Sequence, residues 1–255
     1  MKRVLTALVL IPLVVYLVIR GRSPLVFVAV TLCAMLCYRE YCAIAAGYGI
    51  KNLGPMGFAA GLGVLALNDN SVMFLTIVAL AGISLAMRSA ELSETLPRAS
   101  AMLLGVVYIF GAWKCAILLR SINPYWLLFA LAINWVGDIF AYYVGKSLGQ
   151  HKLARRISPG KTWEGAIASL VAAIAFGVAY LNYFLPGLPP VEVVAISALA
   201  NVAGQLGDLA ESALKRGAGV KDSGALLPGH GGLLDRVDST LFSVPAVYVA
   251  LSLVK

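Results

Sequence analysis

The chain has 255 residues, of which 60% are hydrophobic and 13% are charged, about half the charged share of an ordinary globular domain. This composition excludes a soluble fold with a wetted surface, and it excludes disorder, which requires low hydrophobicity and high net charge. Twenty basic against twelve acidic residues leave a net charge of +8, which must lie in the few segments that water reaches. The sequence therefore predicts an integral membrane protein.

A membrane-spanning helix needs about 20 mainly apolar residues, and nine stretches meet or approach that length. They are centred on residues 4–19, 25–46, 53–67, 71–87, 99–119, 124–145, 165–185, 193–214 and 239–254. Arg39 and Glu40 interrupt the second stretch, where we expect them to pair with neighbouring groups or to extend toward a membrane interface. We predict an all-α polytopic protein with a single membrane domain over 1–255, in which 1–120 form apolar spans and 124–255 form the spans and loops of a polar site.

The orientation of the chain follows from its basic residues. With nine spans, the N-terminus shares a membrane side with the connections near 47–52, 88–98, 146–164 and 215–238. Fourteen Lys and Arg residues lie on that side and four on the other. Because cytoplasmic loops carry the basic excess, we expect the N-terminus and both long loops in the cytoplasm and the C-terminus outside.

Two of the predicted spans carry polar residues on one helical face. In the sixth, Asn134, Asp138, Tyr142 and Lys146 follow one another at intervals of four. In the eighth, residues spaced by three or four are Ser197, Asn201, Gln205, Asp208, Ser212 and Lys215, with Glu211 beside them. A carboxylate at membrane depth costs on the order of 3 kcal/mol, so such groups usually line a wet cavity or bind a cation. For the Asn, Ser and Gln positions, hydrogen bonding between packed helices is the alternative.

Five acids are expected near one membrane face and would repel one another unless cations lie among them: Asp138, Asp208, Glu211, Asp235 and Asp238. The loop from 146 to 162 holds five basic residues and no acid, and the second loop interleaves Lys and Arg with Asp. Glycines around His230 would let backbone N–H groups approach an anion. This pattern predicts a site for phosphate groups together with Mg²⁺, which prefers one or two carboxylates plus substrate phosphates. A solvated basic loop would explain the lysines alone but not the acids.

One run of residues is more specific than these patterns. It reads Ser212-Ala213-Leu214-Lys215-Arg216, four residues, Lys221-Asp222, seven residues, His230-Gly231-Gly232, two residues, Asp235-Arg236-Val237-Asp238. This run resembles the signature of phosphatidate cytidylyltransferases, also called CDP-diacylglycerol synthases, at all of its fixed positions. Further agreement lies in Gly137-Asp138 with Ala141-Tyr142, in the stretch from Ser158 to Gly165, and in Gln205-Leu206-Gly207-Asp208-Leu209. The resemblance covers about residues 134–240.

The resemblance implies a Mg²⁺-dependent reaction of CTP with phosphatidate that yields CDP-diacylglycerol and diphosphate, in bacterial phospholipid synthesis. It also implies a polytopic enzyme of the bacterial cytoplasmic (inner) membrane, usually a homodimer, with its site open to the cytoplasm. No nucleic acid partner is expected. The metal is Mg²⁺, alone or with a second metal or a monovalent cation.

Roles for single residues are hypotheses at this point. The catalytic set is Asp208, Asp235, Asp238, Lys215, Lys221 and His230, and the three aspartates are also the expected Mg²⁺ ligands. The substrate-binding set is Arg216, Arg236, Ser158, Lys161, Thr162, Asp138, Ser212, Gly231 and Gly232. Asp138 is open between a metal ligand, a lysine partner and a cytosine contact, and His230 between a phosphate donor and an acid.

Two other functions fit parts of the pattern. A CTP-dependent kinase acting on a polyprenol-type lipid would bind the same nucleotide but release CDP. A transporter of an anionic solute would need polar stripes that reach both membrane faces, often with broken helices. Here the acids and basic loops gather on one side, which favours the cytidylyltransferase.

Overall fold

The computed structural model describes residues 2–51, 53–67, 71–87, 91–226 and 231–254. The chain falls into two compact units. Unit 1 contains residues 1–22, 115–213 and 237–255, and unit 2 contains residues 23–114 and 214–236. Each of the nine apolar stretches is helical, which confirms the helical part of the prediction. The single membrane domain with parts 1–120 and 124–255 stays a prediction.

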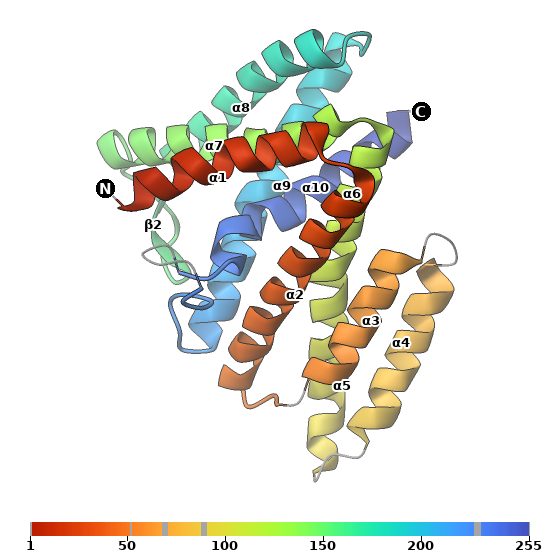
Figure 1. Cartoon of the computed structure of the whole chain (residues 1–255). Helices are drawn as coiled ribbons and strands as arrows, with labels where there is room; N and C mark the ends of the chain where they lie inside the picture. The colour runs from red at the N-terminus through yellow and green to blue at the C-terminus, as the bar shows by residue number, and fades with distance from the viewer. Residues whose placement is uncertain (1, 52, 68–70, 88–90, 227–230, 255) are drawn as a thin grey trace. The chain divides into compact units, whose positions relative to one another are not determined.

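Unit 1 is built on a pair of long helices, α7 (Pro124–Ser147) and α8 (Trp163–Phe184), which pack side by side (Figure 1). Asn123 starts α7, because its side chain accepts a hydrogen bond from the N–H of Tyr125 at 3.0 Å, and Pro124 suits the first helical position. The unit also contains α1 (Lys2–Arg20), the greater part of α9 (Pro190–Gly217) and nearly all of α10 (Leu234–Val254).

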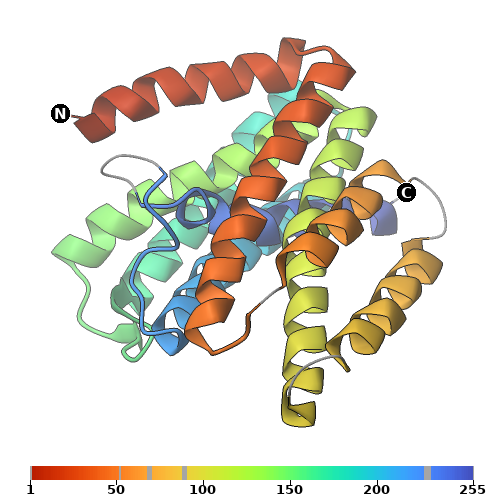
Figure 2. The same cartoon turned by 60° about the horizontal axis from the view of Figure 1, so that its bottom comes forward.

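Unit 2 contains α2 (Ser23–Gly47), α3 (Gly54–Ala66), α4 (Ser71–Ala86) and the turn η1 (Leu92–Glu94). A continuous helical stretch follows, made of α5 (Thr95–Gly105), the π-helix η2 (Val106–Gly111) and α6 (Ala112–Ile122), which leaves the unit after residue 114. Helices α3 and α4 lie side by side, drawn in orange in Figure 2.

Aromatic rings fill the core of unit 2. Tyr38 is fully buried, with ring centroids 5.0 Å from Phe58 and 5.4 Å from Phe110. Lys114 donates from its Nζ to the carbonyls of Leu65 at 3.0 Å and Leu67 at 2.8 Å. Those carbonyls belong to the C-terminal end of α3, so Lys114 satisfies acceptors that the helix itself leaves open.

Five helical segments are long and apolar enough to cross a membrane, by length and composition, within the part of the chain that the structure describes. They are Ser23–Gly47, Leu92–Ile122, Pro124–Ser147, Trp163–Phe184 and Pro190–Gly217, and three apolar helices of 10–17 residues accompany them: Leu10–Arg20, Gly54–Ala66 and Phe74–Ala86. These segments support a polytopic membrane protein. The number nine and the orientation of the spans stay predictions.

Several polar residues of unit 1 hold helices together. Asn201 donates to the Oγ of Ser169 on α8 at 3.0 Å, and Gln205 donates to the carbonyl of Ala166 at 3.2 Å. Asn134 on α7 donates to the Oγ of Ser243 on α10 at 2.7 Å. The helix-packing alternative therefore holds for Asn134, Asn201 and Gln205. Ser197 is likewise buried and donates to the carbonyl of Val193 at 2.7 Å.

The long basic loop contains a hairpin that the all-α prediction lacks. Strands β1 (Lys152–Ala154) and β2 (Ser158–Thr162) pair antiparallel, with Lys152 opposite Thr162 and Ala154 opposite Ser158. The ring Nδ1 of His151 lies 2.6 Å from Oε1 of Glu164, just beyond the strands. Short strands of this kind give almost no period-two signal, since only a few residues alternate.

Candidate functional site

Asp235 is the most highly coordinated acid of the signature run. Its side chain is 6% exposed and forms an ion pair with Lys215, whose side chain is 10% exposed. The backbone N–H of Gly232 donates to Oδ2 at 2.8 Å, and the N–H of Ser223 donates to the same oxygen at 3.0 Å. All four residues belong to unit 2. The structure therefore brings together four residues of the segment 212–238, three of which were predicted as site residues.

These partners fix the charge of Asp235. Burial, the largest single effect, raises its pKa, whereas the hydrogen bonds from Lys215, Gly232 and Ser223 and the charge of Lys215 lower it. The net pKa lies below the ordinary value of 3.8. Asp235 is therefore an anion at neutral pH, and Lys215 is the cation that compensates it.

Two glycines allow the chain to pass this close to the acid. Gly231 has φ of +80°, a left-handed conformation, and a Cβ there would lie 2.6 Å from Oδ2 of Asp235. A Cβ on Gly232 would lie 2.1 Å from the Oγ of Ser223. The predicted substrate-binding role of these glycines is untested, and the structure gives them a definite packing role beside Asp235.

Glu40 is a residue of this neighbourhood that sequence reasoning missed. It lies on α2, is 8% exposed, and accepts hydrogen bonds from the Oγ of Ser223 at 2.8 Å and from the N–H groups of Leu233 at 2.9 Å and Leu234 at 2.8 Å. The only signal in the sequence is an acid inside an apolar helix, and nothing there names its partners. The expected pairing with nearby groups along the chain is wrong for Glu40, because its partners lie 183 to 194 residues further along. Its extension toward a membrane interface stays a prediction.

A second acid–base pair lies in unit 1. The Nζ of Lys161, on β2, is 2.5 Å from Oδ2 of Asp208 on α9, and their side chains are 28% and 32% exposed. The Oγ of Ser212, one turn along α9, donates to Oδ1 of Asp208 at 3.4 Å. A partly exposed pair of this kind contributes about 0–1 kcal/mol to stability, so a phosphate or a cation can separate it at little cost.

The neighbouring residues of the hairpin have other contacts. The Oγ1 of Thr162 accepts from the N–H of Gly165 at 3.2 Å, which caps α8, and the side chain is buried. Ser158 is half-buried at the start of β2. Their predicted roles on a phosphate are untested, and Thr162 already serves the helix.

The other predicted residues differ in exposure. Arg216, Lys221, Arg236 and Asp138 are exposed, and Arg216 donates to the carbonyl of Val220 at 3.2 Å. Asp238 is half-buried on α10 and accepts from the N–H of Ser239 at 2.7 Å. His230 lies outside the described residues.

The carboxylates described above suit Mg²⁺ as ligands only in part. Carboxylate oxygens are the ligands that this ion prefers. Among the residues that the structure describes, however, no group of three or more His, Cys, Asp or Glu lies close enough to hold a metal. One or two carboxylates are nevertheless enough when substrate phosphates supply the remaining oxygens, which is the usual arrangement for Mg²⁺.

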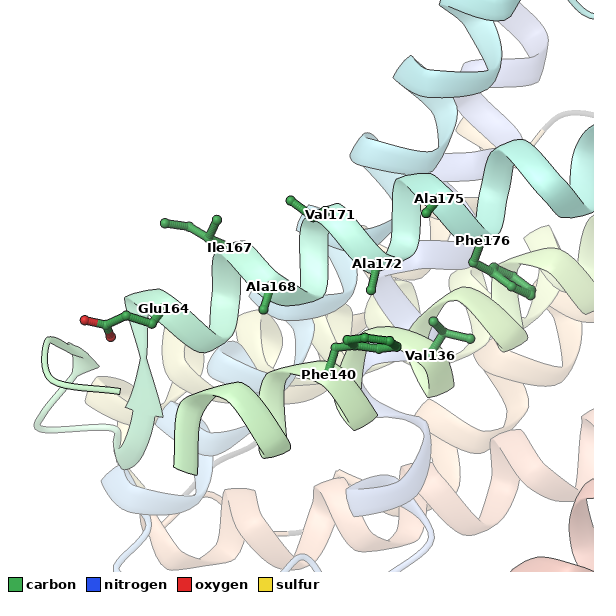
Figure 3. A pocket seen from close by; sticks show the side chains of 9 residues that line it. All are labelled: Val136, Phe140, Glu164, Ile167, Ala168, Val171, Ala172, Ala175 and Phe176. Atoms are coloured by element: carbon green, nitrogen blue, oxygen red, sulfur yellow. The ribbon is translucent and has the colours of Figure 1, made fainter. Parts of the chain in front are cut away.

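An apolar groove of about 800 Å³ runs between α7 and α8 in unit 1 (Figure 3). It is lined by Val136, Phe140, Glu164, Ile167, Ala168, Val171, Ala172, Ala175 and Phe176. Of the lining side chains, Glu164 lies at one end of the groove and Phe176 at the other (Figure 3). This lining suits hydrocarbon and offers no cation, so a triphosphate must bind elsewhere.

Comparison with known proteins gives the family. Residues 1–254 match the model described as the cytidylyltransferase family. A Bacillus subtilis (strain 168) protein is 42% identical over 153 residues, 59% of this chain and 57% of that protein. A Brucella abortus biovar 1 (strain 9-941) protein is 46% identical over 136 residues, 52% of this chain and 50% of that protein. A Staphylococcus aureus (strain COL) protein is 40% identical over 149 residues, 58% of this chain and 57% of that protein.

Each of these three relatives is named phosphatidate cytidylyltransferase. The chain matches between half and three-fifths of their length, and the family model covers nearly all of the chain itself. The chain therefore belongs to the cytidylyltransferase family.

Proposed function

We propose that this protein is a phosphatidate cytidylyltransferase, which converts CTP and phosphatidate into CDP-diacylglycerol and diphosphate. The observation that carries the proposal is the family match over residues 1–254, together with relatives that all bear this name. The paired acids and cations of the signature run support it, because both substrates are polyanions.

The reaction is a nucleotidyl transfer. A phosphate oxygen of phosphatidate attacks the α-phosphorus of CTP, the bond from that phosphorus to the bridging oxygen breaks, and diphosphate leaves with the electron pair. The attacking oxygen is already ionised near neutral pH, so no strong general base is needed. The task of the protein is to bring two anions together and to stabilise charge that moves onto the leaving group.

Lysine and arginine side chains can meet this task. Lys161 and Lys215 are held by Asp208 and Asp235, and each can turn to a phosphate oxygen when substrate arrives. Arg216, with the other exposed cations Lys221 and Arg236, would neutralise the triphosphate and the lipid headgroup. An arginine can bind phosphate with two parallel hydrogen bonds, which orients as well as attracts.

We assign Mg²⁺ as the cofactor, which one or two of the predicted ligands Asp208, Asp235 and Asp238 would hold together with substrate phosphates. When bound, it would supply positive charge that stabilises the substrate phosphates. Asp208 is the more accessible of the two acids that form ion pairs with lysines, since its side chain is 32% exposed and that of Asp235 is 6% exposed. We also place the protein in the bacterial cytoplasmic membrane as a homodimer, with its N-terminus and its site toward the cytoplasm.

The test follows the two ends of the CTP triphosphate. Purified protein in detergent receives phosphatidate, Mg²⁺ and CTP labelled on either the α- or the γ-phosphorus. We expect the α-label in the lipid and the γ-label in free diphosphate. No label in the lipid in either arm would refute the cytidylyltransferase. A parallel reaction with a polyprenol in place of phosphatidate tests the lipid kinase, which would place the γ-label in that lipid and release CDP.

A matched pair of variants tests the assigned residues. Asp208→Asn should lower turnover by at least about tenfold, as expected when a group that stabilises transferring phosphates is lost. Glu91→Gln removes the same charge from an exposed residue of unit 2 and should leave turnover unchanged. Equal activity in the two variants would refute the assignment of Asp208.

A further inference from the structure

Glu40 is a buried acid within a candidate membrane span, Ser23–Gly47, and its contacts are unusually complete. One carboxylate oxygen, Oε1, accepts from the N–H of Leu233, and the other, Oε2, accepts from the N–H of Leu234 and from the Oγ of Ser223. Acids inside membrane spans are rare and usually functional, because they are costly to insert. All of these contacts lie within unit 2.

Glu40 accepts hydrogen bonds from backbone N–H groups at the start of α10 that the local sequence leaves without a side-chain acceptor. The first N–H groups of any helix lack partners within it, and Leu233, just before α10, has no side-chain acceptor to supply. Glu40 takes this role from α2, and its charge lies at the positive end of the α10 dipole. The beginning of α10 is therefore held by a residue from a distant part of the chain.

Ser223 connects Glu40 to the acid of the signature run. Its Oγ donates to Glu40 and accepts from the N–H of Asp235 at 3.3 Å, while its own N–H donates to the carboxylate of Asp235. Packing is close as well, since a Cβ on Gly232 would lie 2.4 Å from Oε2 of Glu40. A displacement of Glu40 must therefore move Ser223, Gly232 and Asp235 together.

We propose that Glu40 is a positioning residue for the cytidylyl transfer: it holds residues 223 and 231–235 so that Asp235 is presented in its active arrangement. The expected effect on kcat rests on the proposed function, whereas the expected effect on local order does not. A glutamate is required because all three partners of Glu40 are donors. A glutamine would present an NH₂ group to at least one of them.

The first test measures local order without activity. In Glu40→Gln, hydrogen exchange in a peptide covering residues 231–236 should become about tenfold faster or more, the change expected when hydrogen bonds to a buried charged acceptor are lost. Exchange in α7 and α8 should not change. Arg39→Gln is the control, because Arg39 is the exposed neighbour on the same helix. Unchanged exchange at 231–236, or an equal rise throughout the chain, would overturn the proposal.

The second test is kinetic. We expect kcat of Glu40→Gln to fall at least about tenfold with the KM for CTP within about threefold of wild type, the pattern of a lost transition-state interaction. Arg39→Gln should keep both. Loosened exchange with an unchanged kcat would overturn the positioning role. If the wild type forms no CDP-diacylglycerol, the proposed function fails, and the exchange result still stands alone.

A third variant covers the case in which Glu40→Gln does not fold. Ser223→Ala removes the connecting hydroxyl but leaves the carboxylate in place, and it should show the same local loosening and the same fall in kcat. Where Glu40→Gln does fold, the effect of the double variant should be smaller than the sum of the two single effects, because both act through one chain of hydrogen bonds. Additive effects, or a Ser223→Ala variant identical to wild type, would contradict the proposal.

Discussion

The ion pair of Lys215 and Asp235 makes a quantitative prediction about stability. The two side chains are only 10% and 6% exposed, so solvent screens the pair weakly. Removing one partner of a buried pair typically costs about 3–5 kcal/mol, because the remaining charge stays buried. Asp235→Asn also weakens the hydrogen bonds from Gly232 and Ser223, so we expect a loss of about 3 kcal/mol in the free energy of unfolding.

The double variant distinguishes this explanation from general damage. Lys215→Met should cost about 2 kcal/mol, because Asp235 keeps its two backbone donors. Asp235→Asn combined with Lys215→Met should then cost about 1–2 kcal/mol less than the sum of the single changes, since the charges are removed together.

The assay is denaturant unfolding in detergent, followed by tryptophan fluorescence. A matched surface pair provides the control: Glu94 and Arg98 lie 2.6 Å apart with side chains 38% and 25% exposed. Glu94→Gln should cost less than about 1 kcal/mol. If the double variant loses the sum of the two single losses in free energy of unfolding, within about 0.5 kcal/mol, the reasoning is refuted.

Other parts of the structure give further predictions. Gly232→Ala should destabilise the protein by about 1–3 kcal/mol, because its Cβ would overlap Ser223 and Glu40, whereas Gly160→Ala, with open space around the Cβ, should melt like wild type in a thermal scan. Thr162→Val should lower the free energy of unfolding by about 1 kcal/mol through loss of the α8 cap, and Thr162→Ser should restore it. Removal of Mg²⁺ by a chelator should abolish transfer, and added Mg²⁺ should restore it; activity that survives chelation would contradict the cofactor assignment.

The helices could be predicted from the sequence because they depend on a local property. Stretches such as 124–145 and 165–185 are apolar over enough residues that the backbone must satisfy its own hydrogen bonds, and only a helix does this within one segment. The hairpin at 152–162 could not be predicted in the same way. Its strands are short and basic, and they are held by each other, with His151 and Glu164 paired beside them.

The acid–base pairs were predictable in their residue types but not in their individual contacts. The crowding of acids indicated that cations must lie among them. Lys161 does form an ion pair with Asp208, and Lys215 forms one with Asp235. Which lysine pairs with which acid depends on tertiary packing, and so does the partnership of Glu40 with Leu234, 194 residues away. A pattern of single residues contains no information on such distant pairs.

The π-helical turn Val106–Gly111 has a consequence for how the chain can vary. A π-turn accommodates one residue more than an α-turn, so a single deletion there can be absorbed as the turn reverts to α-helical winding, whereas a further inserted residue would rotate everything after it by about 100° about the helix axis. Lys114 would then point away from the carbonyls of Leu65 and Leu67, and the end of α3 would lose its donor. The wide turn can thus take up the loss of one residue but not the gain of another, so a single deletion at 106–111 should be tolerated better than an insertion there.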